Sequence, residues 1–173
     1  VEPTGRRAFV FDTLSGSISV IDIARRSLAA TLSVDASPSR GQFSARGDRL
    51  FVIHDRSPYA TVVDPRQLTI LNRARLRSAA SAIRVDSRRG LLYLAGPTSP
   101  TVEVYDTNTL LPVDFLKAPA GAAHLTIDAE ENHLYMASPG TSRLAIGSLA
   151  DRRVVSEIDV VQGPYWVAVM GEK

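Results

Sequence analysis

The chain has 173 residues, of which 45% are hydrophobic and 22% are charged, and it contains no cysteine. This composition is that of an ordinary globular domain with its own core. The absence of cysteine excludes a disulfide framework, a thiolate metal site, a CxxCH haem attachment and a cysteine nucleophile. The net charge of +2 is small and the arginines are scattered along the chain, so we expect no nucleic-acid partner.

Membrane and export signals are absent from the residues given. No window of 18 apolar residues occurs, so we expect no membrane span, and no signal peptide is visible. The first residue is Val1 rather than Met, and it falls inside a repeat. We therefore expect that the chain is the product of processing or trimming, or begins at a boundary inside a longer protein.

The chain repeats itself at a constant spacing without an insertion or deletion. This spacing separates the aromatic residues Phe9, Phe51, Tyr93 and Tyr135. It also separates Asp22, Asp64 and Asp106, with Ser148 in the fourth place. The predicted strand starts Pro38, Ala80, Ala122 and Pro164 follow the same spacing. Four copies of one structural unit, over residues 1–42, 43–84, 85–126 and 127–168, explain why these residues recur. A set of equivalent positions in the four repeats is called a column below.

Within each repeat the hydrophobic period is two, which predicts strands. The segments 17–22, 101–106 and 153–160 are short and rich in β-branched residues. Glycine, proline and serine separate such segments at the same place in every repeat. Each repeat is therefore predicted to form four antiparallel strands joined by tight turns, with no helix longer than about one turn.

The fold class that this pattern predicts is all-β, a β-propeller with four blades in this chain. Residues 1–173 are expected to form one propeller domain or segment of a propeller. Val1 falls in the column of Phe43, Val85 and Ile127, so the first blade lacks the beginning of its innermost strand. Residues 163–169 have the sequence of that missing strand, and we expect them to complete a first blade as a clasp.

Three ways of closing the ring stay open. The four blades could form a compact four-bladed ring, two chains could form an eight-bladed ring, or the chain could be the C-terminal part of a longer ring. Repeats of this length usually belong to rings of seven or eight blades, which favours the second and third arrangements. We therefore expect either self-association or missing upstream blades.

The repeat resembles that of the YVTN β-propeller family. The resemblance is carried best by Phe9-Val10 with Ile18 to Asp22, and by Leu92 to Leu94 with Val102 to Asp106. It covers all four repeats, although the fourth has Leu144 to Ser148 in place of the Val-x-Val-Ile-Asp strand. The resemblance implies an exported protein, periplasmic or at the cell surface, of bacteria or archaea. Rings similar to it carry haem d1, form subunits of quinone-linked amine dehydrogenases or hydrolyse lactones.

Candidate ligand-binding residues gather where the predicted innermost strands begin, at one mouth of the central channel. They are Arg40, Arg84, His124, Tyr165 and Trp166, with His54 in the corresponding loop of the second repeat. Arginine supplies a fixed charge and tryptophan a stacking face, so this set could hold an anionic or planar ligand. The alternative is that Trp166 packs between blades and the others are solvated.

Catalytic and metal sites are not predicted. The three repeated aspartates are expected to accept backbone N–H bonds in turns. His54 next to Asp55 lacks a predictable nucleophile, and His133 lies at the opposite face from His124. The acidic cluster Asp128, Glu130, Glu131 and Asn132 occupies an ordinary turn. We therefore expect no metal and no cofactor.

The function that these patterns favour is a non-catalytic binding or scaffold propeller that engages a protein or a small ligand at a ring face or the channel mouth. The alternative is the propeller part of a periplasmic oxidoreductase, or of a haem-d1 or quinone-linked electron-transfer protein. A lactonase-like hydrolase would need a metal held by acidic and histidine side chains at the channel, for which the sequence offers too few candidates.

Overall fold

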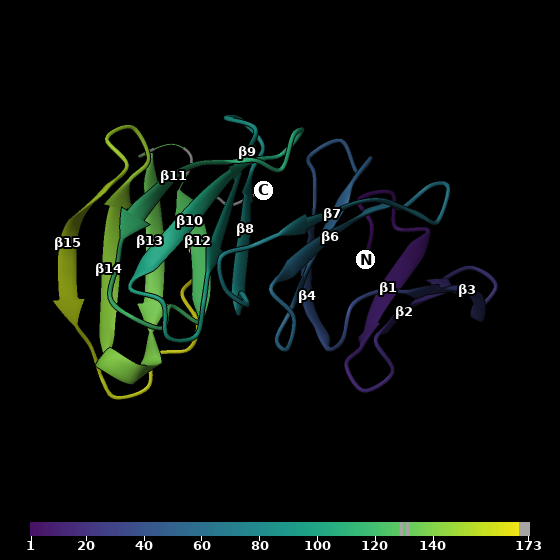
Figure 1. Cartoon of the computed structure of the whole chain (residues 1–173), viewed down its shortest axis with the longest axis horizontal. Coiled ribbons are helices and arrows are strands. Elements are labelled where there is room, and N and C mark those ends of the chain that lie inside the picture. Colours follow the sequence, from purple (N-terminus) through teal and green to yellow (C-terminus); the bar gives the residue numbers. More distant parts are fainter. Residues whose placement is uncertain (129, 131, 170–173) are drawn as a thin grey trace. The chain divides into compact units, whose positions relative to one another are not determined.

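The computed structural model describes residues 1–128, 130 and 132–169. In these residues the chain forms fifteen β-strands and one 3-10 turn, η1 (Pro139–Thr141). The strands make four antiparallel sheets, in each of which neighbouring strands are consecutive in the chain (Figure 1). This arrangement confirms the all-β class and the propeller blades. Among the described residues, no helix is long and apolar enough to cross a membrane.

The first two sheets belong to the N-terminal half. The first has three strands, β1 (Arg7–Asp12), β2 (Ser17–Asp22) and β3 (Ser27–Ser33). The second has four, β4 (Pro38–Phe43), β5 (Leu50–His54), β6 (Tyr59–Asp64) and β7 (Thr69–Arg75).

The last two sheets have four strands each. The third contains β8 (Ala82–Asp86), β9 (Leu91–Ala95), β10 (Thr101–Asp106) and β11 (Pro112–Lys117). The fourth contains β12 (His124–Asp128), β13 (His133–Ser138), β14 (Arg143–Ser148) and β15 (Arg153–Asp159).

Residues 163–169 form no strand in this structure, and the first sheet has no fourth strand among the described residues. In this structure Trp166 contacts His124, which belongs to the same compact unit. The clasp remains a prediction.

The strands follow the alternation that the sequence predicts. In β2, Ile18 and Val20 are fully buried, whereas Ser17 and Ser19, which alternate with them, are half-buried. Successive side chains of a strand point to opposite faces, so one face of the sheet packs and the other carries the polar residues.

The turns before the outermost strands repeat in backbone conformation as well as in sequence. Residues with φ between 51° and 58° occur at Arg26, Leu68, Leu110 and Arg152, each one repeat after the last. Oδ1 of Asp22, Asp64 and Asp106 accepts backbone N–H bonds of these turns at 2.7–2.9 Å. In the fourth turn Oγ of Ser148 accepts the N–H of Asp151 instead. The structural role predicted for the three aspartates is confirmed.

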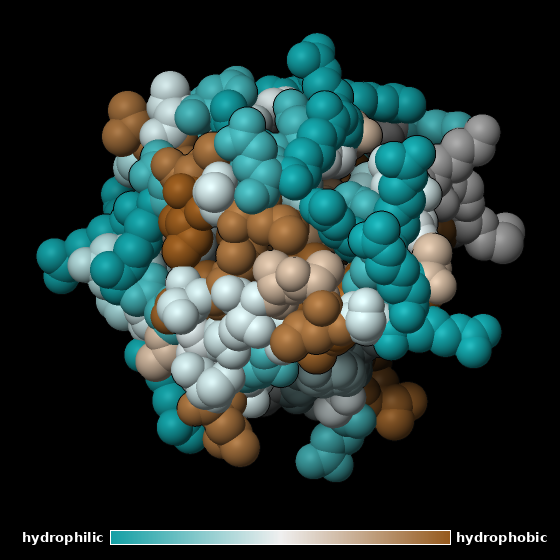
Figure 2. All heavy atoms as spheres, turned by 90° about the vertical axis from the view of Figure 1, so that its right-hand side faces the viewer, coloured by the Kyte–Doolittle hydropathy of each residue, from teal (hydrophilic) through white to brown (hydrophobic). Residues whose placement is uncertain are grey.

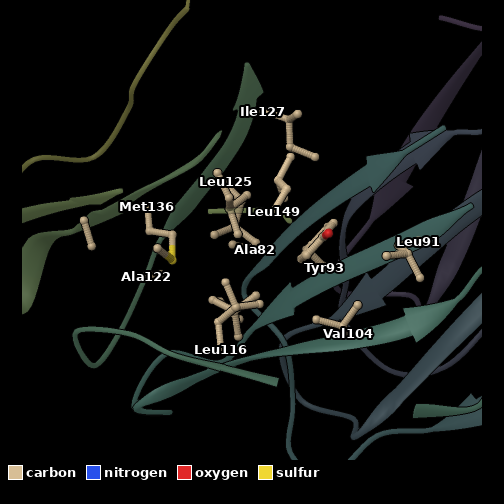
Figure 3. Close-up of a cluster of buried hydrophobic side chains, with 14 residues drawn as sticks. Ala82, Leu91, Tyr93, Val104, Leu116, Ala122, Leu125, Ile127, Met136 and Leu149 are labelled. Carbon is tan, nitrogen blue, oxygen red and sulfur yellow. The ribbon is translucent and has the colours of Figure 1, made fainter. Parts of the chain in front are cut away.

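The chain divides into two compact units, Val1–Ala79 and Ala80–Lys173. In the first, Ile18, Leu50 and Val52 form the buried core, and the ring of Phe9 lies edge-on to that of Phe43 at 5.5 Å. In the second, side chains of the third and fourth sheets meet in one cluster, which includes Tyr93, Leu116 and Met136 (Figure 3). Each unit is a pair of packed blades, and the single domain over residues 1–173 remains a prediction.

Candidate functional site

Two of the predicted ligand-binding residues lie in direct contact. The rings of His124, at the start of β12, and Trp166 have centroids 3.8 Å apart and are tilted by 32°. The backbone N–H of Val167 donates to Nδ1 of His124 at 3.4 Å, so this nitrogen carries no proton. The two contacts hold the C-terminal segment against the innermost strand of the fourth blade.

The aromatic side chains of this segment face solvent. Trp166 is 68% exposed and Tyr165, its neighbour in sequence, is 59% exposed. The segment follows a turn in which Gly163 has a φ of 75°, a conformation that glycine adopts without strain. His124, Tyr165 and Trp166 together are named the aromatic site below.

Arg84 belongs to the same unit and lies on β8, the innermost strand of the third blade, opposite Tyr93 in the β8–β9 ladder. Burial lowers the pKa of the Arg84 guanidinium, and the nearby carboxylate of Asp86 opposes that effect. Tyr93 is fully buried, and the same loss of solvent raises the pKa of its hydroxyl to about 12. Arg84 is therefore a cation held in a poorly hydrated part of the inner strand layer.

Arg40 and His54 belong to the unit Val1–Ala79. Arg40 is half-buried on β4, opposite Ile53 of β5. His54 is fully buried at the end of β5, and its two ring nitrogens already have partners. Nδ1 lies 3.1 Å from the carbonyl oxygen of Asp35 and Nε2 lies 3.0 Å from Oγ1 of Thr61.

This environment makes His54 a structural residue. Because a carbonyl oxygen only accepts hydrogen bonds, Nδ1 donates to Asp35 and Nε2 accepts from the hydroxyl of Thr61 in the neutral ring. Burial lowers the pKa of His54, and the nearby charge of Arg73 acts in the same direction, against that of Asp35. We therefore leave His54 out of the aromatic site. The convergence of Arg40 and Arg84 on that site remains a prediction.

The sequence did not indicate the group that surrounds His54. The carboxylate of Asp35 pairs with the guanidinium of Arg73, which lies 4.0 Å from the ring centre of Tyr59. Asp35 lies in a loop and Arg73 on an outermost strand, 38 residues apart. The sequence separation of Asp35 and Arg73 does not indicate that they are in contact. Only the proximity of Thr61 to His54 could have been predicted, because the two residues lie seven positions apart on the paired strands of a hairpin.

The described residues hold no cluster of three His, Cys, Asp or Glu side chains close enough to bind a metal ion. In the acidic turn, Oδ1 of Asp128 accepts the backbone N–H of Glu130 at 3.0 Å, and Asn132 has a φ of 60°. Glu131 of that cluster lies outside the described residues. His133 pairs with Asp128 and His124 with Ala137, so the two histidines lie at opposite ends of the β12–β13 ladder.

Comparisons with known proteins identify the fold. No family model matches the chain, and no curated protein does. Among solved structures it is similar to a chain of Kuenenia stuttgartiensis hydrazine synthase, with a TM-score of 0.81 and 18% identity over 91% of this chain and 47% of that chain. The chain thus spans about half the length of the structure that it matches. A likeness at this identity shows the propeller fold, which many unrelated functions share.

Proposed function

We propose that this chain is a non-catalytic β-propeller scaffold that binds a protein or a small planar ligand through the aromatic site. The observation that supports the proposal is the pair of large aromatic side chains, Tyr165 and Trp166, that stand more than half exposed beside an innermost strand. Exposed aromatic residues that are held in place are typical of binding surfaces, because they offer a large contact area for few rotatable bonds.

The contacts of His124 prepare Trp166 for such a role. Stacking on His124 and the bond from Val167 restrict the indole, so less conformational entropy is lost when a ligand covers it. Arg84, which belongs to the same compact unit, is proposed to add fixed positive charge, which would favour a planar anion. The resemblance to YVTN propellers supports an exported, periplasmic or extracellular location as part of this proposal.

The absence of catalysis is part of the proposal too. A general base needs a titratable nitrogen or oxygen within reach of a substrate, and both nitrogens of His54 are engaged inside the second sheet. His124 uses Nδ1 to hold the backbone of Val167. A ring nitrogen engaged in this way positions the chain instead of taking a proton from a substrate.

Trp166 is the sole tryptophan of the chain, so its fluorescence reports directly on the aromatic site. A titration with 2-naphthoate, a planar anion, is expected to quench the emission saturably. In His124→Ala the stacking partner is removed, and Kd is expected to rise by about 3- to 10-fold. Phe115→Ala, which removes an exposed aromatic residue from β11, is the matched control and should leave Kd unchanged.

Two results would count against the proposal. Quenching that rises linearly with 2-naphthoate, with the same slope in His124→Ala, would mean collision rather than binding. A chromophore that copurifies with the chain and absorbs visible light would favour the alternative, an oxidoreductase or a haem-d1 or quinone-linked electron-transfer propeller.

A further inference from the structure

The outermost strand of the second sheet, β7, carries a concentration of positive charge. Arginine stands at positions 66, 73, 75 and 77 of the segment 65–79, and no acidic residue occurs in that segment. Arg73, Arg75 and Arg77 occupy alternate positions, the first two on β7 and the third just after it. Side chains at alternate positions of a strand lie on the same face. All three arginines are exposed, so their guanidinium groups form one positively charged row.

The repeat shows that the fold does not require these arginines. The columns of Arg73 and Arg75 hold different residue types in the other three repeats, namely Thr31, Phe115 and Glu157 in the first column and Ser33, Lys117 and Asp159 in the second. β3 contains no charged residue. Asp114 of β11 and Glu157 of β15 each form an ion pair with an arginine. The row of arginines is therefore a property of this blade and not of the propeller architecture.

β7 also has a row of backbone groups that point away from its sheet. Among the described residues, its neighbour in the sheet is β6 alone. The N–H of Leu76 donates to the carbonyl oxygen of Pro58 at 2.8 Å, so the backbone groups of Leu76 face β6. Since these groups alternate in direction along a strand, those of Arg73 and Arg75 face the outer edge. In agreement, the N–H of Arg73 donates to a side-chain acceptor, Oδ1 of Asn72, at 2.7 Å.

The guanidinium of Arg73 is held in place by two neighbours. Its Nε and Nη2 donate to the two carboxylate oxygens of Asp35, and it lies 4.0 Å from the ring centre of Tyr59. Within the part of the chain that the structure describes, no ion pair includes Arg75 or Arg77. The net positive charge of the edge therefore comes from Arg75 and Arg77, beside a fixed Arg73.

Hydrophobic side chains near the start of β7 add apolar contact area. Ile70 is 46% exposed and Leu71 is 51% exposed. Figure 2 faces the side on which β1–β3 of the same unit lie in Figure 1, and it shows long hydrophilic side chains that project around hydrophobic ones. Exposed apolar residues with a charged rim are typical of a surface that binds another chain.

We propose that the outer edge of β7 binds an extended acidic segment of a partner protein, which adds to the second sheet as a further strand. In strand addition the backbone groups of the edge provide affinity and the side chains provide specificity. Alternate residues of an extended chain lie about 6.5–7 Å apart, the spacing expected for Arg73, Arg75 and Arg77. An acidic residue at every second position of the segment then lies across from an arginine, where opposite charges stabilise a cross-strand pair. This edge belongs to the unit Val1–Ala79, so the inference is independent of the aromatic site.

A fluorescein-labelled peptide of four Glu-Thr repeats is the probe, and fluorescence anisotropy measures its binding. Arg75→Glu/Arg77→Glu is expected to raise Kd at least about 10-fold, because attraction becomes repulsion at two positions. Arg6→Glu/Arg46→Glu is the matched control, because it changes the net charge equally at two exposed arginines of the same unit. Its Kd should stay within about 2-fold of the parent value, since exposed charges away from the edge are screened.

Hydrogen exchange tests whether the peptide pairs with the backbone. The N–H of Arg75 is expected to exchange at least about 10-fold more slowly when the peptide is bound, as measured by NMR. The N–H of Ser33, in the same column on the outermost strand of the first sheet, is the control and should not change. A peptide that binds without protecting Arg75 would contradict strand addition.

Three further results would overturn the proposal. No binding at millimolar peptide would leave the arginines as residues that prevent the edges of two copies from pairing. An equal loss of affinity in both charge-reversal variants would mean that the peptide responds to net charge alone. A single-stranded oligonucleotide that binds more tightly than the peptide and displaces it would assign the edge to nucleic acid.

Discussion

Nε2 of His54 lies 3.0 Å from Oγ1 of Thr61 in the buried layer of the second sheet, and the pair ties β5 to β6 by their side chains. Because burial lowers the pKa of His54, the neutral ring is the form that the folded chain stabilises. The unfolded chain takes up a proton first when the pH falls. The free energy of unfolding therefore has its full value above about pH 6.5 and decreases below it.

His54→Gln should weaken this pH dependence, since an amide keeps a donor and an acceptor but does not titrate in this range. Urea unfolding at about pH 7.5 and pH 5.5 measures how the free energy of unfolding depends on pH. Uptake of a single proton changes this free energy by up to about 1.4 kcal/mol per pH unit. An identical loss of stability in the variant and the parent would show that other groups cause the pH dependence.

Gly41 on β4 has no room for a side chain. A Cβ at this position would lie 2.5 Å from Cζ of Phe11 and 3.1 Å from the carbonyl oxygen of Phe51. Gly41→Ala is therefore expected to lower the free energy of unfolding by about 1–3 kcal/mol. Gly140→Ala is the control, because no atom lies within 4 Å of its Cβ position, and a change within about 0.5 kcal/mol is expected. Equal thermal stability of the two variants would be inconsistent with this packing of β4 against β1.

Leu116 shows how the third and fourth blades are held together. It is fully buried on β11, and its Cδ2 lies 3.2 Å from the Cβ position of Gly147 on β14. Leu116→Ala should cost about 2–5 kcal/mol, since it leaves a cavity in the cluster of Figure 3. The neighbouring Phe115 is 48% exposed, and Phe115→Ala should cost far less. Chemical denaturation of both variants measures whether the buried contact between the two blades contributes more to the free energy of unfolding than the exposed face of β11 does.

The contact between His124 and Trp166 should protect the C-terminal segment from proteolysis. Chymotrypsin cleaves after aromatic residues. Tyr165 and Trp166 are exposed, and His124 contacts the ring of Trp166 and accepts the backbone N–H of Val167. His124→Ala is expected to speed cleavage there several-fold, whereas His133→Ala at the other end of the ladder should not. Equal cleavage rates, followed by mass spectrometry, would mean that the stacking does not restrain the segment.

The fold was predictable because the residues that form the strands and turns recur in every repeat. Alternation as in Ile18 and Val20, and turn residues such as Asp22 and Asp64, determine strands and turns locally, and the structure has them as the sequence predicts. The constant spacing of the repeats then required four similar sheets.

The candidate site was predictable only in part. A repeat column places His124 and Trp166 at equivalent points of successive inner strands, and the structure brings their rings together. The same column argument could not tell that His54 is buried, because this depends on Thr61 and on a loop carbonyl of Asp35. It also could not reveal that residues 163–169 form no strand, since their sequence has the alternation of one.

The central claim is that the aromatic site binds a planar ligand. Fluorescence of Trp166 during a titration with 2-naphthoate, in the unaltered chain and in His124→Ala, tests this claim most directly. The account predicts saturable quenching, with a Kd that is about 3- to 10-fold higher in the variant. Quenching that rises linearly with 2-naphthoate and has the same slope in both proteins would contradict it.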